Sequence, residues 1–197
     1  MDAAHDYASA IRYLHNTFPA YVSYVQKTRA KIGPIDRSDE GTIVVRTSDG
    51  KVVSGKPSEI QINASSKFHG DAVEHSPFDP DCYAPVSASS TTFDGAPAEA
   101  LALRGTCKSG HDDKDDASDL DFTTLYVNPH TFQPLSVSGV NNDDTVSVRL
   151  EEDFSAVDGH TVPSLLSVRV LGHGWMGWLD IRARVEYSRY QFLSSMP

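Results

Sequence analysis

The sequence lacks most of the features that usually reveal a function. Its 197 residues contain no apolar run that approaches the length of about 20 residues that a membrane-spanning helix needs. Basic residues are the minority, 17 against 27 acidic ones, and the resulting net charge of −10 argues against a surface for nucleic-acid phosphates. The N-terminal residues Met1 to His5 contain neither the basic nor the apolar region of a signal peptide.

Catalytic motifs are also missing. The sequence contains no G-x-S-x-G elbow, no Walker loop and no G-x-G-x-x-G fingerprint. Its eight histidines show no HxH or HxxxH spacing on a predictable strand or helix, which gives no basis for a metal site. The aspartate-rich segment 110–121 fails the calcium-loop register, since a loop starting at Asp113 would have Ser118 at its sixth position and Thr124 at its twelfth. We therefore expect no enzymatic activity, no metal and no cofactor.

Only two cysteines are present, Cys82 and Cys107. Cys82 falls in a proline-rich segment, and Cys107 follows a predicted strand. A disulfide between them would join this segment to the end of a sheet. By the loop-entropy relation it would stabilise the folded protein by about 3–4 kcal/mol. It would also indicate an oxidising compartment. The alternative is two unpaired thiols in a reducing compartment.

Apolar residues recur every three or four positions over 2–18, which predicts an amphipathic helix. Asp2 is the expected N-cap, and Pro19 is expected to end the helix.

The rest of the chain is rich in strand patterns. The clearest lies at 178–192, where Leu179, Ile181, Ala183, Val185 and Tyr187 alternate with polar residues, as in a half-buried strand. Further strands are expected at 20–32, 42–47, 52–53, 59–64, 98–106, 122–127, 133–138, 145–154 and 165–171, separated by Asx-, Gly- and Pro-rich turns. The proline-containing segment 68–93 is predicted to be a long irregular loop.

These elements predict an α+β fold of one domain spanning 1–197. A helix at 2–18 is followed by a strand group at 20–64, the irregular loop at 68–93, and a second strand group with a C-terminal meander at 98–192. An antiparallel sheet of this length is expected to curl. We expect an unclosed half-barrel whose concave face is covered by the N-terminal helix.

Two segments of the sequence resemble motifs of a known superfamily. The run Tyr-Val-Asn-Pro-His-Thr-Phe-Gln-Pro-Leu at 126–135 resembles a strand-and-turn corner of the outer-membrane lipoprotein-sorting (LolA-like) superfamily. The run Phe-Ser-Ala-Val-Asp-Gly-His-Thr-Val-Pro at 154–163 resembles a later step of the same fold. The resemblance implies an unclosed barrel that holds acyl chains or other hydrophobic ligands. It also implies a periplasmic or secreted protein whose signal peptide is presumed to have been removed.

The leading interpretation is therefore a non-enzymatic protein that binds or carries a lipid or acyl chain in a half-barrel cavity. The candidate cavity residues lie on alternating apolar faces: Ile60, Ile62, Leu101, Leu103, Val146, Val148, Val168, Val170, Ile181 and Val185. A possible rim is formed by Trp175, Met176 and Trp178 at an expected hairpin tip.

Two other interpretations stay open. The protein could be an interaction or sensor module of the cell envelope with a filled core, which would meet an envelope protein through the tryptophan tip and the 68–93 loop. It could also be a hydrolase that gathers loop Asp and His residues in a cleft, a constellation that sequence does not display.

Overall fold

The fold was analysed in a computed structural model, which describes residues 2–17, 19–48, 51–56, 78, 80–106, 122–142, 146–174 and 177–195. The chain begins with helix α1 (Ala3–Thr17). The Asp2 carboxylate accepts hydrogen bonds from the backbone N–H groups of Ala4 and His5, at 3.1 and 3.2 Å, which confirms Asp2 as the N-cap.

In the described part of the chain, ten strands follow α1 and form one sheet in which every neighbouring pair is antiparallel. The strands are β1 (Tyr21–Ile32), β2 (Ile35–Arg46), β3 (Lys51–Lys56), β4 (Tyr83–Phe93), β5 (Ala96–Gly105), β6 (Phe122–Val127), β7 (Pro134–Asn142), β8 (Val146–Val157), β9 (His160–Gly174) and β10 (Gly177–Leu193).

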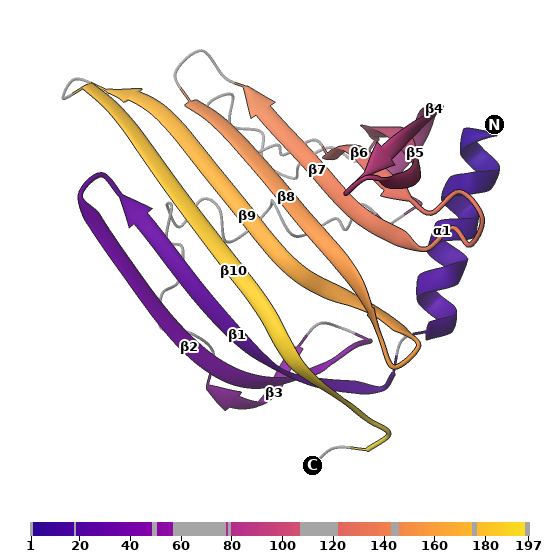
Figure 1. The fold of residues 1–197 in the computed structure, drawn as a ribbon, viewed down its shortest axis with the longest axis horizontal. Helices are drawn as coiled ribbons and strands as arrows, with labels where there is room; N and C mark the ends of the chain where they lie inside the picture. The colour runs from indigo at the N-terminus through magenta and orange to yellow at the C-terminus, as the bar shows by residue number, and fades with distance from the viewer. Residues whose placement is uncertain are drawn as a thin grey trace.

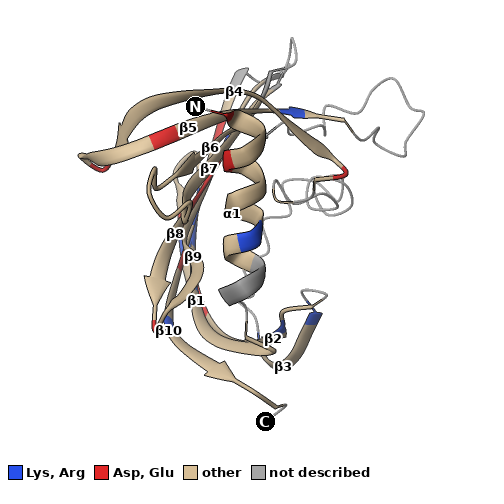
Figure 2. Cartoon of the chain, turned by 90° about the vertical axis from the view of Figure 1, so that its right-hand side faces the viewer, with Lys and Arg blue, Asp and Glu red and all other residues tan. Residues whose placement is uncertain are grey.

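The spatial order of the strands is β3-β2-β1-β10-β9-β8-β7-β6-β5-β4 (Figure 1). Neighbouring strands are successive in the chain except for β1, which pairs with β10. Because β3 and β4 form the two edges and do not pair with each other, the sheet is unclosed. Figure 2 shows α1 standing along one side of this curved sheet. The predicted half-barrel with an N-terminal helix on its concave face is confirmed.

Tight turns determine the register of several hairpins. Asp158 and Gly159, with φ of 50° and 83°, join Val157 to its partner His160 in a two-residue turn. Asp94 and Gly95, with φ of 48° and 78°, join Phe93 to Ala96 in the same way. Both pairs adopt the left-handed conformation that two-residue hairpins require and that Asp-Gly sequences supply.

The predicted irregular loop at 68–93 differs from the structure in its second half. Strand β4 occupies Tyr83–Phe93 and pairs with β5 along its whole length. Because β4 is an edge strand with a register shift between Pro85 and Ser87, its proline and its serine- and threonine-rich tract do not interrupt the sheet. Residues 68–77 lie outside the described part of the chain.

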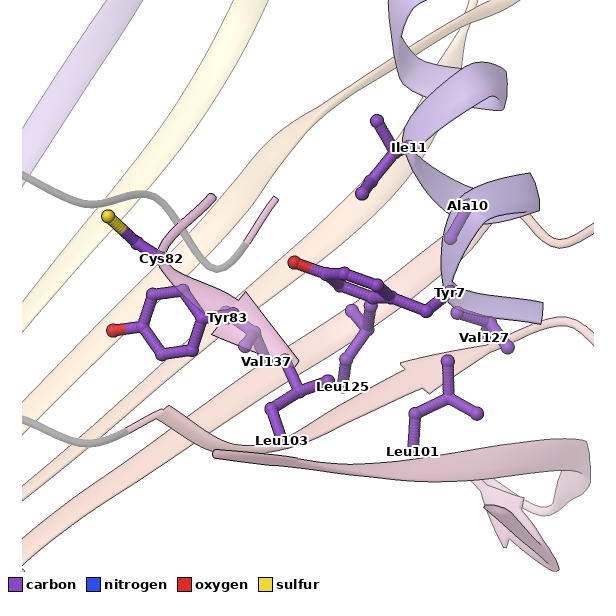
Figure 3. Close-up of a cluster of buried hydrophobic side chains, with 10 residues drawn as sticks. All are labelled: Tyr7, Ala10, Ile11, Cys82, Tyr83, Leu101, Leu103, Leu125, Val127 and Val137. Atoms are coloured by element: carbon purple, nitrogen blue, oxygen red, sulfur yellow. The ribbon is translucent and has the colours of Figure 1, made fainter. Parts of the chain in front are cut away.

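The largest core cluster lies between α1 and the strands of one end of the sheet (Figure 3). Tyr7, Ala10 and Ile11 of the helix pack there against side chains from β4 to β7. The sheet and the residue before β4 contribute these buried residues: Cys82, Tyr83, Leu101, Leu103, Leu125, Val127 and Val137. The apolar stripe of α1 is thus buried against the β4–β7 half of the concave face.

Candidate functional site

The predicted cavity residues fall into two groups. Leu101 and Leu103 are 0% and 7% exposed and belong to the core beneath α1. Val148, Val168, Val170 and Ile181 form a separate, smaller cluster with Leu150. The helix therefore already covers the first pair, and the second cluster is the part of the predicted cavity that remains relevant to a ligand.

Sheet register places the second cluster in two adjacent rows on the concave face, one that contains Leu150 and Val168 and one that contains the other three residues. Val148 pairs with Val170, Val170 with Ile181, and Ile181 with Ile32. The row begins at Val148, which is 1% exposed, and ends at Ile32 and its partner Ile35, which are 43% and 54% exposed. An apolar path thus runs from the buried interior to the open end of the β1–β2 hairpin.

Some predicted site residues cannot be placed. Ile60, Ile62, Trp175, Met176 and Cys107 lie outside the described residues, as do the side chains of Val146 and Trp178. The predicted rim therefore stays a prediction. Val185 is buried, at 3% exposed, on the concave face of β10.

The Cys82–Cys107 disulfide also stays a prediction. Cys82 is 4% exposed, immediately before β4. The backbone N–H of Thr106 donates to the carbonyl of Cys82 at 2.8 Å. The residue that precedes Cys107 is thus fixed next to Cys82, an arrangement that suits the predicted bond.

The sequence analysis missed a carboxyl group in the middle of the concave face. Glu152 of β8 pairs with Leu166 of β9 on one side and with Val137 of β7 on the other. Leu166 pairs in turn with Val185, and Val185 with Thr28 of β1, so all five side chains project from the same face. Glu152 is partly exposed, yet desolvation by its surroundings and the nearby charge of Asp153 raise its pKa to about 7.

Three tyrosines lie close to Glu152. The ring centroid of Tyr24 is 5.5 Å from those of both Tyr187 and Tyr190, edge-on to the first and tilted to the second. Burial and the charge of Glu152 raise the pKa values of all three phenols, which keeps them protonated. The Tyr190 hydroxyl donates a hydrogen bond to the carbonyl of Pro163.

A β-bulge brings these rings together. Val25 pairs with Ser188 and Ser23 with Gln191, so Tyr24 faces two residues of β10, Arg189 and Tyr190. Arg189 has a φ of 56°, which few non-glycine residues adopt. Tyr187 and Tyr190 are three positions apart and would point to opposite faces of a regular strand. The extra residue in the bulge shifts the alternation of side chains along β10 by one position. Both rings therefore lie on the same face as Tyr24.

The convex face carries charged side chains instead. Asp180 accepts hydrogen bonds from Arg169, at 3.0 and 3.1 Å, and from Arg182, with a shortest distance of 2.7 Å. Arg29 pairs with Asp36, and Arg184 with Glu186. A groove of about 390 Å³ lies among these residues. Because most of its cations already have a carboxylate partner, we interpret this face as a solvated ion-pair network.

Comparison with known proteins identifies the fold. No family model matches the sequence, and no curated protein matches it either. A DUF1329 family protein from Desulfovibrio piger has a similar structure, with a TM-score of 0.54 and 12% identity, covering 100% of this chain and 96% of that one. A putative outer membrane lipoprotein-sorting protein domain from Vibrio parahaemolyticus gives a TM-score of 0.50 and 10% identity, covering 100% and 95%. A LolA superfamily protein from Nitrosomonas europaea gives 0.44 and 13%, covering 100% and 96%.

The first two similarities extend over the whole chain at very low sequence identity, so they establish shape and not activity. No helix in the described part of the chain combines the length and hydropathy needed to cross a membrane. The predicted resemblance is confirmed at the level of fold: the described part of this chain shares its architecture, one helix against an unclosed antiparallel half-barrel, with the DUF1329 family protein and the lipoprotein-sorting domain.

Proposed function

We propose that this protein binds or carries a hydrophobic ligand, a lipid or an acyl chain, along the concave face of its sheet. The observation that carries the proposal is the apolar row from Val148 to Ile32, which starts in the core and ends in exposed side chains. Leu179, 47% exposed, lies one concave-face position beyond Ile181 and widens the exposed end. Large apolar side chains that remain exposed on a concave surface favour a ligand or partner over solvent.

The proposal includes a periplasmic or secreted location and the absence of an enzymatic role. Support comes from the LolA-like fold shared with the lipoprotein-sorting domain from Vibrio parahaemolyticus and from the predicted disulfide.

The test is native mass spectrometry of the purified protein, followed by organic extraction of whatever remains bound. We expect a stoichiometric lipid or fatty-acid adduct, or uptake of an added fatty acid. Val168→Asp, in the second cluster, is expected to abolish that uptake, because a carboxylate in the row next to the apolar row disfavours a hydrocarbon chain. Ser167→Asp is the matched control, because residue 167 faces the convex side of the same strand.

A second candidate is an interaction or sensor module of the cell envelope. The same exposed side chains, Ile32, Ile35 and Leu179, favour it, since they would also suit a protein partner. A native protein that takes up neither lipid nor an apolar dye would contradict the carrier proposal and favour this alternative.

A further inference from the structure

The cluster formed by Glu152 and the three tyrosines has no role in a purely apolar cavity. A carboxyl group between Val137 and Leu166 costs free energy on desolvation, and a non-glycine residue at φ 56° adds strain. Such features persist where a site needs them. Glu152 is also crowded enough to be desolvated and still partly exposed, as expected of a side chain at the bottom of a concavity.

We propose that Glu152, Tyr24, Tyr187 and Tyr190 bind the cationic head group of an amphiphile, an amine or a quaternary ammonium, whose hydrocarbon chain lies along the apolar row. This inference rests on the proposed function and specifies the class of its ligand.

Charge selects this class. The faces of tyrosine rings carry negative electrostatic potential and attract alkylammonium groups, and a carboxylate nearby adds a formal counter-charge. The cross-strand rows through Thr28, Ala30 and Ile32 contain no Lys or Arg on β1, β8, β9 and β10, as far as these strands are described. On β2 the Ala30 row continues to Arg37, whereas the Thr28 row, which contains Glu152, continues to a second acid, Asp39. The nearest row thus offers a cation an acid and offers a phosphate or carboxylate no partner.

Geometry supports the same conclusion. The Tyr24 and Tyr187 rings meet at an interplanar angle of 77° and so form two walls of a corner. Tyr190, tilted by 40° to Tyr24, provides a third ring, held by its hydrogen bond to Pro163. Glu152 belongs to the row that continues through Leu166 and Val185, and Tyr187 is the next concave-face position after Val185. Two concave-face rows, through Val185 and Ala183, lie between the corner and the apolar row, and the Ala183 row continues through the apolar side chains of Val168 and Leu150. One molecule can therefore extend from the corner along these rows toward the apolar row.

The experiment compares two amphiphiles with the same chain, dodecyltrimethylammonium and dodecyl maltoside, each below its micelle concentration, by calorimetry at pH 8. We expect the cationic compound to bind at least about tenfold more tightly, the size of effect expected of a desolvated cation–π site with a counter-charge. Glu152→Gln is expected to remove most of that preference. Glu151→Gln, which deletes the adjacent but exposed, convex-facing carboxylate, should retain it.

A second pair of variants tests the rings. Tyr187→Phe keeps the aromatic face and should retain the preference, whereas Tyr187→Leu should reduce it. Equal affinity for the two amphiphiles, or an equal effect of Glu151→Gln and Glu152→Gln, would overturn the head-group site and leave the carrier function standing. Binding of neither amphiphile would overturn both.

The pH dependence supplies another readout. In the described part of the chain, the titratable groups that interact with Glu152 are Asp153 on its own strand and Tyr24, Tyr187 and Tyr190 on β1 and β10. The same cross-strand row ends at Asp39 of β2. Since Glu152 must be ionised to attract a cation, the affinity for dodecyltrimethylammonium should fall between pH 8 and pH 6 and that for dodecyl maltoside should not. A parallel fall for both compounds would count against the site.

Discussion

Leu166 lies directly opposite Glu152 in the β8–β9 pair, and both side chains project from the concave face. An acid beside a leucine on a largely apolar surface is an unfavourable combination for folding, because ionisation there is opposed by desolvation. The pairing therefore connects the proposed ligand site to the pH dependence of stability.

Replacing Glu152 with Gln should stabilise the protein at high pH. The pKa of Glu152 is raised from 4.5 to about 7 in the folded state. As the pH rises, Glu152 therefore loses its proton at a lower pH in the unfolded state than in the folded state. Stability falls as the pH rises from about 4.5 to about 7 and then stays low. The free energy of unfolding of Glu152→Gln should exceed that of the wild type by about 1–3 kcal/mol at pH 8. Near pH 4 the two free energies should be equal. Urea denaturation at both pH values measures this, with Glu151→Gln expected to differ little from wild type.

A second buried acid should respond in the same direction. Glu99 of β5 is 5% exposed and Asp6 of α1 is 7% exposed. Burial, and then a hydrogen bond that protonated Glu99 donates to the Asp6 carboxylate, raise the pKa of Glu99. We expect Glu99→Gln to increase stability at neutral pH and to lose that advantage in acid. Circular dichroism melts from pH 4 to pH 8 would show it. The exposed Glu40→Gln is the control, and a gain that does not vary with pH would contradict this explanation.

Asp180 should behave in the opposite way. Hydrogen bonds from Arg182 and Arg169 hold its pKa well below the usual range. The stabilisation that Asp180 provides is present at neutral pH. It is lost as the pH falls below the pKa of an ordinary aspartate. Asp180→Asn leaves Arg169 and Arg182, which are direct cross-strand partners, without their shared anion. A small loss of thermal stability is expected at low ionic strength, and added salt should reduce it. A loss that salt leaves unchanged would exclude an electrostatic origin.

The helix should depend on Leu101 more than on any exposed apolar residue. Leu101 is 0% exposed beneath α1. Leu101→Ala should cost about 2–5 kcal/mol of unfolding free energy, as buried leucine truncations do. Val52→Ala, on the edge strand β3 and 44% exposed, should cost far less. Chemical denaturation of the two variants provides the comparison, and similar losses would mean that α1 is not packed as described.

The predicted disulfide has a direct test. Intact mass of the purified protein, measured before and after reduction, should increase by two hydrogens on reduction if Cys82 and Cys107 are joined. Cys82→Ser should then lower stability by about 3 kcal/mol, the loop-entropy value. An unchanged mass would show two free thiols and would remove one support for an oxidising compartment.

Much of the fold was accessible from sequence because long strands with one buried face alternate regularly. The pattern from Leu179 to Tyr187 identified β10, and the stripe through Tyr7 and Ile11 identified α1. Strand β4 was missed because Pro85 and a Ser/Thr tract resemble a loop, and only pairing with β5 makes them a strand.

The candidate head-group site was not predictable in the same way. Glu151, Glu152 and Asp153 are consecutive acids, and the sequence does not say which of them faces the concave side. The tyrosine corner depends on the bulge at Arg189. Regular alternation along the strand would place Tyr187 and Tyr190 on opposite faces, and the bulge shifts this alternation by one residue.

The pairing of β1 with β10 has a consequence for how the protein is made. Among the described residues, strands β1 to β3 join the rest of the sheet through β10, and Tyr21 near the start of the chain pairs with Leu193 near its end. During synthesis the N-terminal strands therefore have no docking partner until nearly the whole chain has emerged. Long-range closure of this kind is slow. The nascent protein stays incompletely folded throughout elongation, the condition in which a chain can still be threaded through a narrow translocation channel.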